Sequence, residues 1–263
     1  MSIFDRFRLD NQVAVITGAG RGIGAAIAKA FAEAGADIVL AARTLEQLEE
    51  TAAAVEAFGR KAVIVQTDVM EEEQLQNLAD RAMAAFGRID ILVNNAGGFP
   101  PKPALATTGR EFEKAFKFNV ASAFNLTRIC VPLMVETAGS GCVINISSIA
   151  GHKPSACFAA YGTVKSSLSY LTQELAQDFA PKVRVNAIAV GSTKTEALNT
   201  VLTPEIEKTM TDLTPMARLG EVEDIALGAL YLASPAASYV TGEILGINGG
   251  LIRLNMDMPR AFE

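Results

Sequence analysis

A tyrosine and a lysine stand four residues apart in Tyr161-Gly-Thr-Val-Lys165, and Ser148 lies thirteen residues upstream. On a helix, side chains at positions i and i+4 lie on the same face, so the phenol and the ammonium are predicted to be neighbours. A nearby positive charge favours the phenolate and lowers a tyrosine pKa from its ordinary value of about 10. Such a pair could take a proton from an alcohol or return one to a ketone, while the Ser148 hydroxyl holds the reacting oxygen. Taken alone, the pattern also fits a solvated helix face.

A glycine-rich turn follows the first apolar run, in Thr17-Gly-Ala-Gly-Arg-Gly-Ile-Gly24. Glycines let the backbone turn tightly and approach a pyrophosphate, whose charge is stabilised by the N-terminus of the following helix. No lysine followed by serine or threonine completes a nucleoside triphosphate loop. A turn that serves chain geometry alone and the glycine turn of a methyltransferase stay open. The strand–glycine–helix context favours a dinucleotide site.

The end of the second predicted strand indicates which dinucleotide binds. An NAD site usually carries an acidic residue about twenty residues after the glycines, where it binds the ribose hydroxyls. This region reads Val39-Leu-Ala-Ala-Arg-Thr44, without an acid. Arg43 could pair with the 2′-phosphate of NADP(H), helped by Arg21 in the glycine turn, although a solvated arginine at a strand end is the plainer alternative. We therefore expect NADP(H) to be preferred, with NAD(H) as the second choice.

Short β-branched apolar runs alternate with helix-length amphipathic stretches along the chain. Strands are expected at 13–17, 37–41, 62–66, 89–94, 142–147, 184–189 and 243–247. Helices are expected at 23–34, 45–58, 72–86, 110–135, 159–179 and 223–233. The alternation predicts an α/β fold, a Rossmann-type, doubly wound parallel sheet of seven strands with helices on both faces. No linker or repeat divides the chain, so residues 1–263 are interpreted as a single domain for cofactor binding and catalysis.

The segment 191–220 does not fit this alternation. It carries Pro204 and Pro215, and its apolar positions favour a short helix. Connections of this length in compact domains are usually functional or mobile. Its place after the carboxyl end of a strand favours a substrate lid over an ordinary surface excursion.

The composition excludes several classes of protein. Of the 263 residues, 50% are hydrophobic and 20% are charged, which is typical of a packed globular protein rather than a disordered one. A net charge of −6 without a basic stripe argues against a nucleic-acid partner. The sequence has no signal-peptide core and no apolar run of the ~18–20 residues that a membrane span needs. We expect a cytoplasmic protein.

Cysteine and histidine are too sparse for a metal site. The three cysteines, Cys130, Cys142 and Cys157, lack metal-ligand spacing and are too few for a disulfide framework. We expect Cys130 and Cys142 to be small buried thiols and Cys157 to lie near the substrate pocket. The single histidine, His152, is interpreted as a pocket-wall or surface residue and not as a catalyst.

Seven motifs in a fixed order resemble the short-chain dehydrogenase/reductase family. The matching stretches are Thr17-Gly-x-x-x-Gly22-x-Gly24, Asp68-Val69, Asn94-Asn-Ala-Gly97, Asn119, Ile146-Ser-Ser148, Tyr161-x-x-x-Lys165 and Arg184-Val-Asn186. Each motif is modest alone, and together they are specific. The resemblance implies an oxidoreductase that interconverts a secondary alcohol and a ketone by hydride exchange with a nicotinamide cofactor.

The resemblance also implies roles for the catalytic residues. Tyr161 would be the general acid/base and Ser148 the anchor of the carbonyl oxygen. Lys165 would activate the tyrosine and bind the cofactor ribose. Asn119 would hold a water of the proton relay by disturbing its own helix.

Further roles follow for the cofactor site. Asp68 would bind the adenine amino group, Val69 would pack on the ring, and Asn94 would brace the sheet. Thr193 and Thr195 match positions that approach the nicotinamide carboxamide. The expected cofactor-binding residues are Gly18, Arg21, Gly22, Ile23, Gly24, Arg43, Asp68, Val69, Asn95, Ala96, Gly97, Tyr161, Lys165, Gly191, Thr193 and Thr195.

Within the family the chain resembles the 7α-hydroxysteroid dehydrogenase subgroup. The resembling stretches are 4–12, 94–98, 101–103, 203–207 and 234–238. They imply shared ancestry and a hydroxysteroid-like substrate. Ala42-Arg43 departs from the NAD-type members, which have an acid there. Val190-Gly191 replaces the usual Pro-Gly and removes the fixed φ of proline at the entry to the lid.

Two other functions stay open at this point. One is reduction of a 3-oxoacyl thioester carried by acyl carrier protein, which would use the same residues. The other is a catalytically inactive dinucleotide-binding regulatory protein, against which the intact catalytic set argues. Because family members commonly form tetramers through their fourth and fifth helices and their last strand, we expect a homotetramer that binds a small hydrophobic alcohol or ketone.

Overall fold

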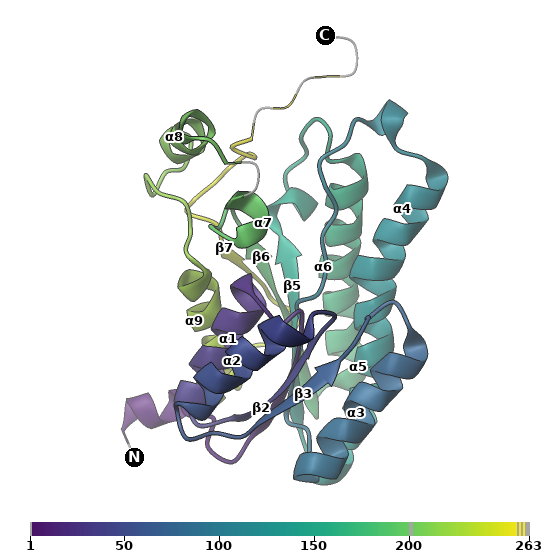
Figure 1. The fold of residues 1–263 in the computed structure, drawn as a ribbon, viewed down its shortest axis with the longest axis vertical. Helices are drawn as coiled ribbons and strands as arrows, with labels where there is room; N and C mark the ends of the chain where they lie inside the picture. Colours follow the sequence, from purple (N-terminus) through teal and green to yellow (C-terminus); the bar gives the residue numbers. More distant parts are fainter. Residues whose placement is uncertain (1, 200–201, 257, 259, 261–263) are drawn as a thin grey trace.

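The computed structural model describes residues 2–199, 202–256, 258 and 260. Its centre is a sheet of seven strands in the order β3-β2-β1-β4-β5-β6-β7, and every neighbouring pair runs parallel. The strands are β1 (Val13–Thr17), β2 (Asp37–Ala42), β3 (Ala62–Gln66), β4 (Ile91–Asn94), β5 (Gly141–Ser148), β6 (Val183–Val190) and β7 (Ile244–Ile247). The expected seven-stranded Rossmann-type sheet is confirmed (Figure 1).

Helices cover both faces of the sheet (Figure 1). They are α1 (Gly22–Glu33), α2 (Leu45–Glu56), α3 (Glu72–Phe86), α4 (Gly109–Phe116), α5 (Ser122–Ala138), α6 (Ala159–Phe179), α7 (Glu196–Asn199), α8 (Pro204–Asp212) and α9 (Val222–Ala233). One apolar core packs α1, α2 and α9 on the sheet, and a second packs α3, α5 and α6 on its other face. The two cores follow from the alternation of side chains along each strand. In β1, Ala14 and Ile16 belong to the first core, while Val13 and Val15 belong to the second.

The helix expected over 110–135 is interrupted. One turn of π-helix, Lys117–Ala121, separates α4 from α5, and the buried Asn119 lies in that turn. Its side-chain amide donates to the Ala115 carbonyl at 2.9 Å. A side chain that bonds the helix backbone in this way competes with regular α-helical hydrogen bonding. The expected local disturbance at Asn119 is confirmed, and the single continuous α-helix is wrong.

The continuous helical stretch Gly109–Ala138 is long and apolar enough, by length and composition, to cross a membrane, with a mean hydropathy of 1.3 in its best window. It is the one such helix among the described residues, and charged and polar residues interrupt its apolar positions, so it is not the uninterrupted apolar run whose absence was expected. Half of that window is buried inside the domain. Residues of α5 such as Leu126 and Cys130 belong to the second core, so the apolar content is that expected of a core helix.

The segment 191–220 leaves the sheet after β6 and returns to the same place. Thr193 pairs with Gly220 in an isolated bridge, and the Lys194 N–H donates to the Gly220 carbonyl at 2.8 Å. Between these ends lie α7 and α8, and residues 200 and 201 of the expected lid lie outside the described part of the chain. An ion pair of 2.7 Å joins Lys194 to Glu207 of α8. The excursion is therefore a closed loop at the carboxyl ends of the strands (Figure 1).

Candidate active site

A cavity of about 590 Å³ lies at the carboxyl ends of the central strands. It spans the place where the chain crosses from the β1–β3 half of the sheet to the β4–β7 half, which is where ligands bind in open α/β sheets. The structure brings most of the predicted site residues to its walls: Gly18, Arg21, Gly22, Ile23, Arg43, Asp68, Val69, Asn95, Ala96, Gly97, Ser148, Tyr161, Lys165, Gly191, Thr193 and Thr195. Two predicted residues, Gly24 and Asn119, are not among the lining residues and act from behind the wall.

Gly24 makes the glycine turn compact. A Cβ at this position would lie 2.2 Å from the carbonyl oxygen of Gly18, so α1 packs directly on the turn. The turn is also tied to the strand next to it, because the Asn95 amide donates to the carbonyls of Thr17 and Gly18 at 2.9 and 3.0 Å. Arg21, the N-cap of α1, makes no side-chain capping bond. The first backbone N–H groups of this helix are thus uncapped, and such a terminus fits the pyrophosphate of a dinucleotide.

The Thr17 hydroxyl makes two hydrogen bonds that the sequence analysis did not predict. It accepts from the backbone N–H groups of Asn95 and Ala96 at 3.0 and 3.1 Å. It thereby holds the strip Asn95–Gly97, along which the cofactor is expected, beside the glycine turn. A threonine at the end of a buried strand carries no signal of this role until the neighbouring strand is placed.

Buried amides brace the centre of the sheet. Asn94 and Asn145 are register partners on β4 and β5, and the Asn94 amide donates to the Asn145 oxygen at 2.9 Å and to the Thr127 hydroxyl at 3.0 Å. The Asn145 amide in turn donates to Thr172 of α6 at 2.9 Å. Because each buried polar group has a partner, the network ties two strands to two helices. The bracing expected of Asn94 is confirmed.

The Arg184-Val-Asn186 motif has a structural role near the end of α9. The Arg184 guanidinium donates to the carbonyls of Leu232, Ala233 and Val240. The Asn186 amide donates to the Val240 carbonyl and its oxygen accepts from Glu243. Cations near a helix C-terminus satisfy its free carbonyls. The motif therefore anchors the last helix and strand to β6.

Two arginines face the end of β2. Arg21 and Arg43 line the cavity together with Ala42, Thr44 and Gln47. The Arg43 carbonyl accepts from the Gln66 amide at 2.8 Å, which fixes its backbone. Within the described residues neither guanidinium is in an ion pair, although the carboxylates of Asp68 and Glu196 also line the cavity. The arrangement can accept an additional anionic group.

Asp68 and Val69 line the same cavity after β3. The Asp68 carboxylate accepts from the Met70 N–H at 3.0 Å, and the Asp68 N–H donates to Gln74 at 2.7 Å, so the carboxylate has a fixed position. Val69 is buried. Their roles toward the adenine ring stay predictions.

Ser148, Tyr161 and Lys165 come together where β5 ends and α6 begins. A hydrogen bond links the Tyr161 phenol to Ser148. The buried Lys165 ammonium lies 5.8 Å from the centre of the Tyr161 ring and donates to the Ile146 carbonyl at 2.9 Å. The expected side-by-side placement of phenol and ammonium on α6 is confirmed.

The charge state of this pair differs from the simplest expectation. Loss of hydration raises the pKa of Tyr161, and the hydrogen bond to Ser148 acts in the opposite direction. Burial also lowers the pKa of Lys165 from 10.5 to about 8. The expected net lowering of the tyrosine pKa by the ammonium is therefore wrong for this structure, in which desolvation is the larger effect.

Asn119 holds the loop that follows β4. Its side-chain oxygen accepts from the Gly98 N–H at 2.8 Å, and its amide donates to the Gly98 carbonyl at 3.1 Å. A Cβ at Gly97 would lie 2.7 Å from this oxygen and 3.0 Å from the Lys165 ammonium nitrogen. Gly97 therefore leaves the room in which Asn119 and Lys165 approach the cofactor strip. The role of Asn119 in holding a water stays a prediction.

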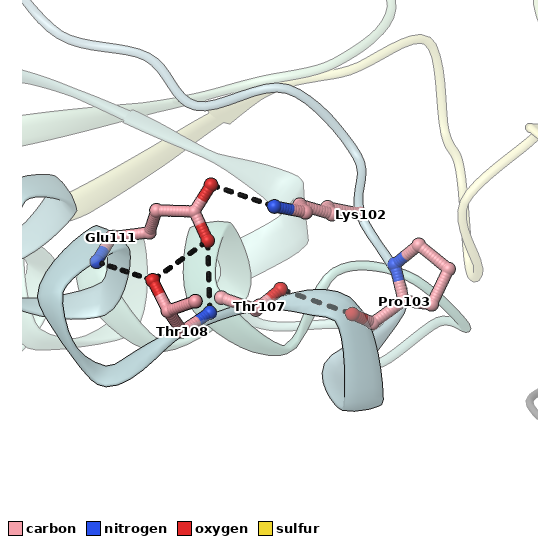
Figure 2. Close-up of polar contacts among 5 residues, drawn as sticks. All are labelled: Lys102, Pro103, Thr107, Thr108 and Glu111. Atoms are coloured by element: carbon pink, nitrogen blue, oxygen red, sulfur yellow. Dashed lines mark hydrogen bonds and ion pairs between the residues drawn. The ribbon is translucent and has the colours of Figure 1, made fainter.

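Two loops that carry no predicted catalytic residue are joined beside the site. The Lys102 N–H donates to the Cys157 carbonyl at 2.8 Å. Figure 2 shows the Lys102 ammonium on Glu111, at 2.6 Å, and the same carboxylate accepts from the N–H and hydroxyl of Thr108. The hydrogen bond from Lys102, followed by those from Thr108, lowers the pKa of Glu111 to about 2. Thr108-Gly-Arg-Glu111 is a capping box that the sequence displays, but its lysine partner could not be found from the sequence.

The environments predicted for two cysteines and the histidine are observed, namely those of Cys130, Cys142 and His152. Cys130 and Cys142 are buried, and burial raises the pKa of both thiols, that of Cys130 to about 12. Cys157 is half-buried, with a left-handed φ of 64°, and is not among the residues that line the dinucleotide cavity, so its expected place near the substrate pocket stays a prediction. His152 is a surface residue whose Nε2 lies 3.1 Å from the Ser169 hydroxyl. Among the described residues no three histidine, cysteine or carboxylate groups form a metal cluster.

The cavity lies at the crossover of the sheet, beside an uncapped helix N-terminus and next to a tyrosine, a lysine and a serine. This combination defines a Rossmann-type oxidoreductase that uses a nicotinamide dinucleotide. The chain belongs to the short-chain dehydrogenase/reductase family. Residues 18–252 match the family model described as Enoyl-(Acyl carrier protein) reductase. The resemblance to the 7α-hydroxysteroid dehydrogenase subgroup is also borne out by relatives and solved structures.

Two relatives cover nearly the whole chain. An uncharacterized oxidoreductase of Mycobacterium tuberculosis is 50% identical over 258 residues, which is 98% of this chain and 98% of the relative. The 7α-hydroxysteroid dehydrogenase of Escherichia coli K12 is 42% identical over 247 residues, 94% of this chain and 96% of the relative. A solved structure of 7α-hydroxysteroid dehydrogenase with NADH and 7-oxo glycochenodeoxycholic acid matches with a TM-score of 0.92 and 40% identity, covering 96% of this chain and 99% of that one. The protein is an enzyme that interconverts alcohols and ketones.

Proposed function

We propose that this enzyme is an NADP(H)-dependent dehydrogenase/reductase for a hydrophobic secondary alcohol or ketone, with Tyr161 as its general acid/base. The observation that carries the proposal is the grouping of Tyr161, Ser148 and Lys165 at one wall of the dinucleotide cavity. The nicotinamide supplies the hydride acceptor or donor when the cofactor is bound. The protein must then orient the substrate oxygen and exchange one proton with it.

Each of the three side chains has a separate task in this proposal. In the reducing direction the Tyr161 hydroxyl donates its proton to the substrate oxygen, and the Ser148 hydroxyl holds that oxygen by a hydrogen bond. The Lys165 ammonium stabilises the phenolate left on Tyr161, because a positive charge favours the charged form of a nearby phenol. Asn119 would complete the path along which solvent returns the proton. In the oxidising direction the same proton moves the opposite way.

A direct test removes the proton donor and compares two ketones. Wild-type protein is assayed for NADPH consumption with a 7-keto steroid and with a 3-oxoacyl thioester, beside a Tyr161→Phe variant. We expect Tyr161→Phe to lower kcat by about 10²–10⁴-fold, the usual size of a general acid/base contribution, with NADPH affinity within about twofold of wild type. Full activity of Tyr161→Phe would contradict the assignment.

The two substrates separate two candidate functions. Turnover of the steroid alone supports a hydroxysteroid-like substrate, which the names of the E. coli relative and of the solved structure favour. Turnover of the thioester alone favours a 3-oxoacyl-thioester reductase; the description of the matching family model shares the acyl carrier protein with this function but names an enoyl reduction. Binding of NADPH without turnover of either would leave the oxidoreductase assignment standing and exclude both substrates.

The NADP(H) preference is supported by Arg21 and Arg43 at the end of β2. We expect Arg43→Ala to weaken NADPH binding by about 10–100-fold, the range of one charge-assisted hydrogen bond of about 1.5–3 kcal/mol, and NADH binding by less than about twofold. Fluorescence titration of each cofactor measures both constants. Arg81→Ala, an exposed residue of α3 away from the cavity, is the matched control. Equal weakening of both cofactors would contradict the preference.

A further inference from the structure

A chain of three hydrogen bonds lies behind the proposed catalytic lysine. His152 Nε2 lies 3.1 Å from Ser169 Oγ, and Ser169 Oγ lies 2.8 Å from Ser147 Oγ. Ser147 Oγ then donates to the backbone carbonyl of Lys165 at 3.0 Å. Ser147 and Ser169 are 2% and 4% exposed, whereas His152 is at the surface. The chain thus connects the single histidine to the backbone of Lys165.

The direction of the chain follows from the number of hydrogens. A serine hydroxyl carries one hydrogen, and that of Ser147 goes to the Lys165 carbonyl. Ser169 therefore donates to Ser147, and its oxygen accepts from an N–H at Nε2 of His152. Both the imidazolium and the neutral tautomer with hydrogen on Nε2 supply this donor. The chain requires an N–H at this point and does not require a charge.

The chain closes a contact between the two segments that carry the catalytic groups. His152 directly follows the short turn Ile149–Gly151, which follows Ser148 at the end of β5. A Cβ at Gly151 would lie 2.6 Å from the backbone nitrogen of Ser166, so the turn packs directly on the backbone of α6. At Gly162, a Cβ would lie 2.8 Å from the Ala150 carbonyl oxygen. The backbones of the turn and of α6 are therefore in direct contact. The buried hydroxyls of Ser147 and Ser169 fix the position of one segment relative to the other.

We propose that His152 is a positioning residue for the acid/base group, acting through Ser169 and Ser147. The inference rests on the proposed roles of Tyr161 and Ser148, whose mutual hydrogen bond spans the same two segments. Without the N–H of His152, the turn after Ser148 is free to shift on α6, and proton transfer is misaligned. The cofactor turn and the lid lie elsewhere, so the defect falls on kcat, while KM and cofactor affinity stay near wild type.

The test compares variants that remove or retain the donor. His152→Leu removes the N–H, His152→Gln can place an amide N–H near the position of Nε2, and Lys153→Leu changes the exposed neighbour as a control. With the ketone that wild-type protein reduces, we expect His152→Leu to lower kcat by about 5–10-fold, as the loss of one hydrogen bond of about 1 kcal/mol predicts. His152→Gln should recover most of kcat, and Lys153→Leu should equal wild type. KM and NADPH affinity of all three should match wild type closely, and Tm of His152→Leu should fall by no more than the roughly 2–4 °C that one lost hydrogen bond predicts.

Two further variants keep the test decisive. Ser169→Ala should lower kcat similarly, and combining it with His152→Leu should add little, because both break one chain. Wild-type kcat in His152→Leu, equal losses in the leucine and glutamine variants, or a parallel fall of Tm and NADPH affinity would each overturn the inference. Activity retained by Tyr161→Phe would instead contradict the proposed function. An inactive Tyr161→Phe beside a fully active His152→Leu would contradict the inference alone.

Discussion

Burial determines the charge properties of Lys165. Its ammonium is almost inaccessible, has the Ile146 carbonyl as a hydrogen-bond acceptor, and has its pKa lowered to about 8. Because the folded-state pKa lies below the ordinary 10.5, the protonated lysine destabilises the folded state at neutral pH. Functional side chains that are held in an unfavourable environment are a common cost of catalysis. The cost is consistent with the role proposed for the Lys165 charge beside Tyr161.

This cost predicts a pH dependence of stability. Between pH about 8 and 10.5 the unfolded chain binds more protons at Lys165 than the folded chain does, so the contribution of this group to stability rises with pH across that window. Relative to Lys165→Met, wild-type protein should gain Tm on the order of 5 °C from pH 7 to pH 10. Melting curves of both proteins without cofactor, at steps of one pH unit, measure the difference. If the difference in Tm between wild type and Lys165→Met does not change with pH, burial of the lysine charge is not the source of that difference.

Lys102 joins the loop after β4 to two other segments, the loop between Ser148 and Tyr161 and the start of α4. Its backbone N–H binds the Cys157 carbonyl of the segment between Ser148 and Tyr161, and its ammonium binds Glu111. Because the pKa of Glu111 is lowered to about 2, the pair is intact above pH 4.5 and is lost only as the pH falls toward 2. At neutral pH the joint is therefore present. It ties down the segment that joins Ser148 to Tyr161, and Lys102, Glu111 and Cys157 are not among the residues that line the dinucleotide cavity.

The position of this joint predicts an effect on the substrate alone. Lys102→Met should raise KM for the ketone by about 2–5-fold, a size consistent with an ion pair that is partly exposed to solvent. The NADPH dissociation constant should not change. Steady-state kinetics and cofactor titration measure the two constants, with Lys114→Met, an exposed position on α4, as the control. A rise in KM equal to that of the control, or a loss of NADPH affinity, would contradict a role in shaping the substrate site.

The elements differ in how far the sequence could predict them. The strands were predictable because each is a buried apolar run between turns, and β1 and β3 match the expected bounds. The strand expected from residue 89 begins at Ile91, and the Asp90 carboxylate just before it accepts from the Val13 N–H and from Arg88. The contact with Val13 depends on a partner far away in the chain.

The site was predictable to the extent that its residues sit in local motifs. Tyr161 and Lys165 share one helix, and the glycines share one turn, so spacing alone places them. The contacts of Thr17 with Asn95, of His152 with Ser169 and of Lys102 with Glu111 join segments that only the folded sheet brings together. The π-turn at Asn119 depends on a choice between hydrogen-bond patterns that composition does not reveal.

At the scale of the whole molecule, the surface carries an apolar row on α4 and α5. Phe112, Phe116 and Phe124 are 36%, 41% and 40% exposed although each is a large aromatic residue. They follow one another at helical spacing along the two helices, with the π-turn between them. Exposed apolar rows of this kind commonly mark protein–protein contacts. The proposed homotetramer would cover the row with the same helices of another copy, as a two-fold contact requires.

The tetramer predicts that charges on this row divide the assembly. Wild-type protein should migrate as four chains of 27.8 kDa in size-exclusion chromatography with light scattering. Phe116→Glu combined with Phe124→Glu should give a smaller species, because a carboxylate buried without a partner opposes association. Its Tm should also become less dependent on protein concentration than that of wild type, since association stabilises by mass action. Arg81→Glu, on α3, controls for added negative charge. A monomeric wild-type protein, or a doubly substituted protein that remains tetrameric, would contradict an interface on α4 and α5.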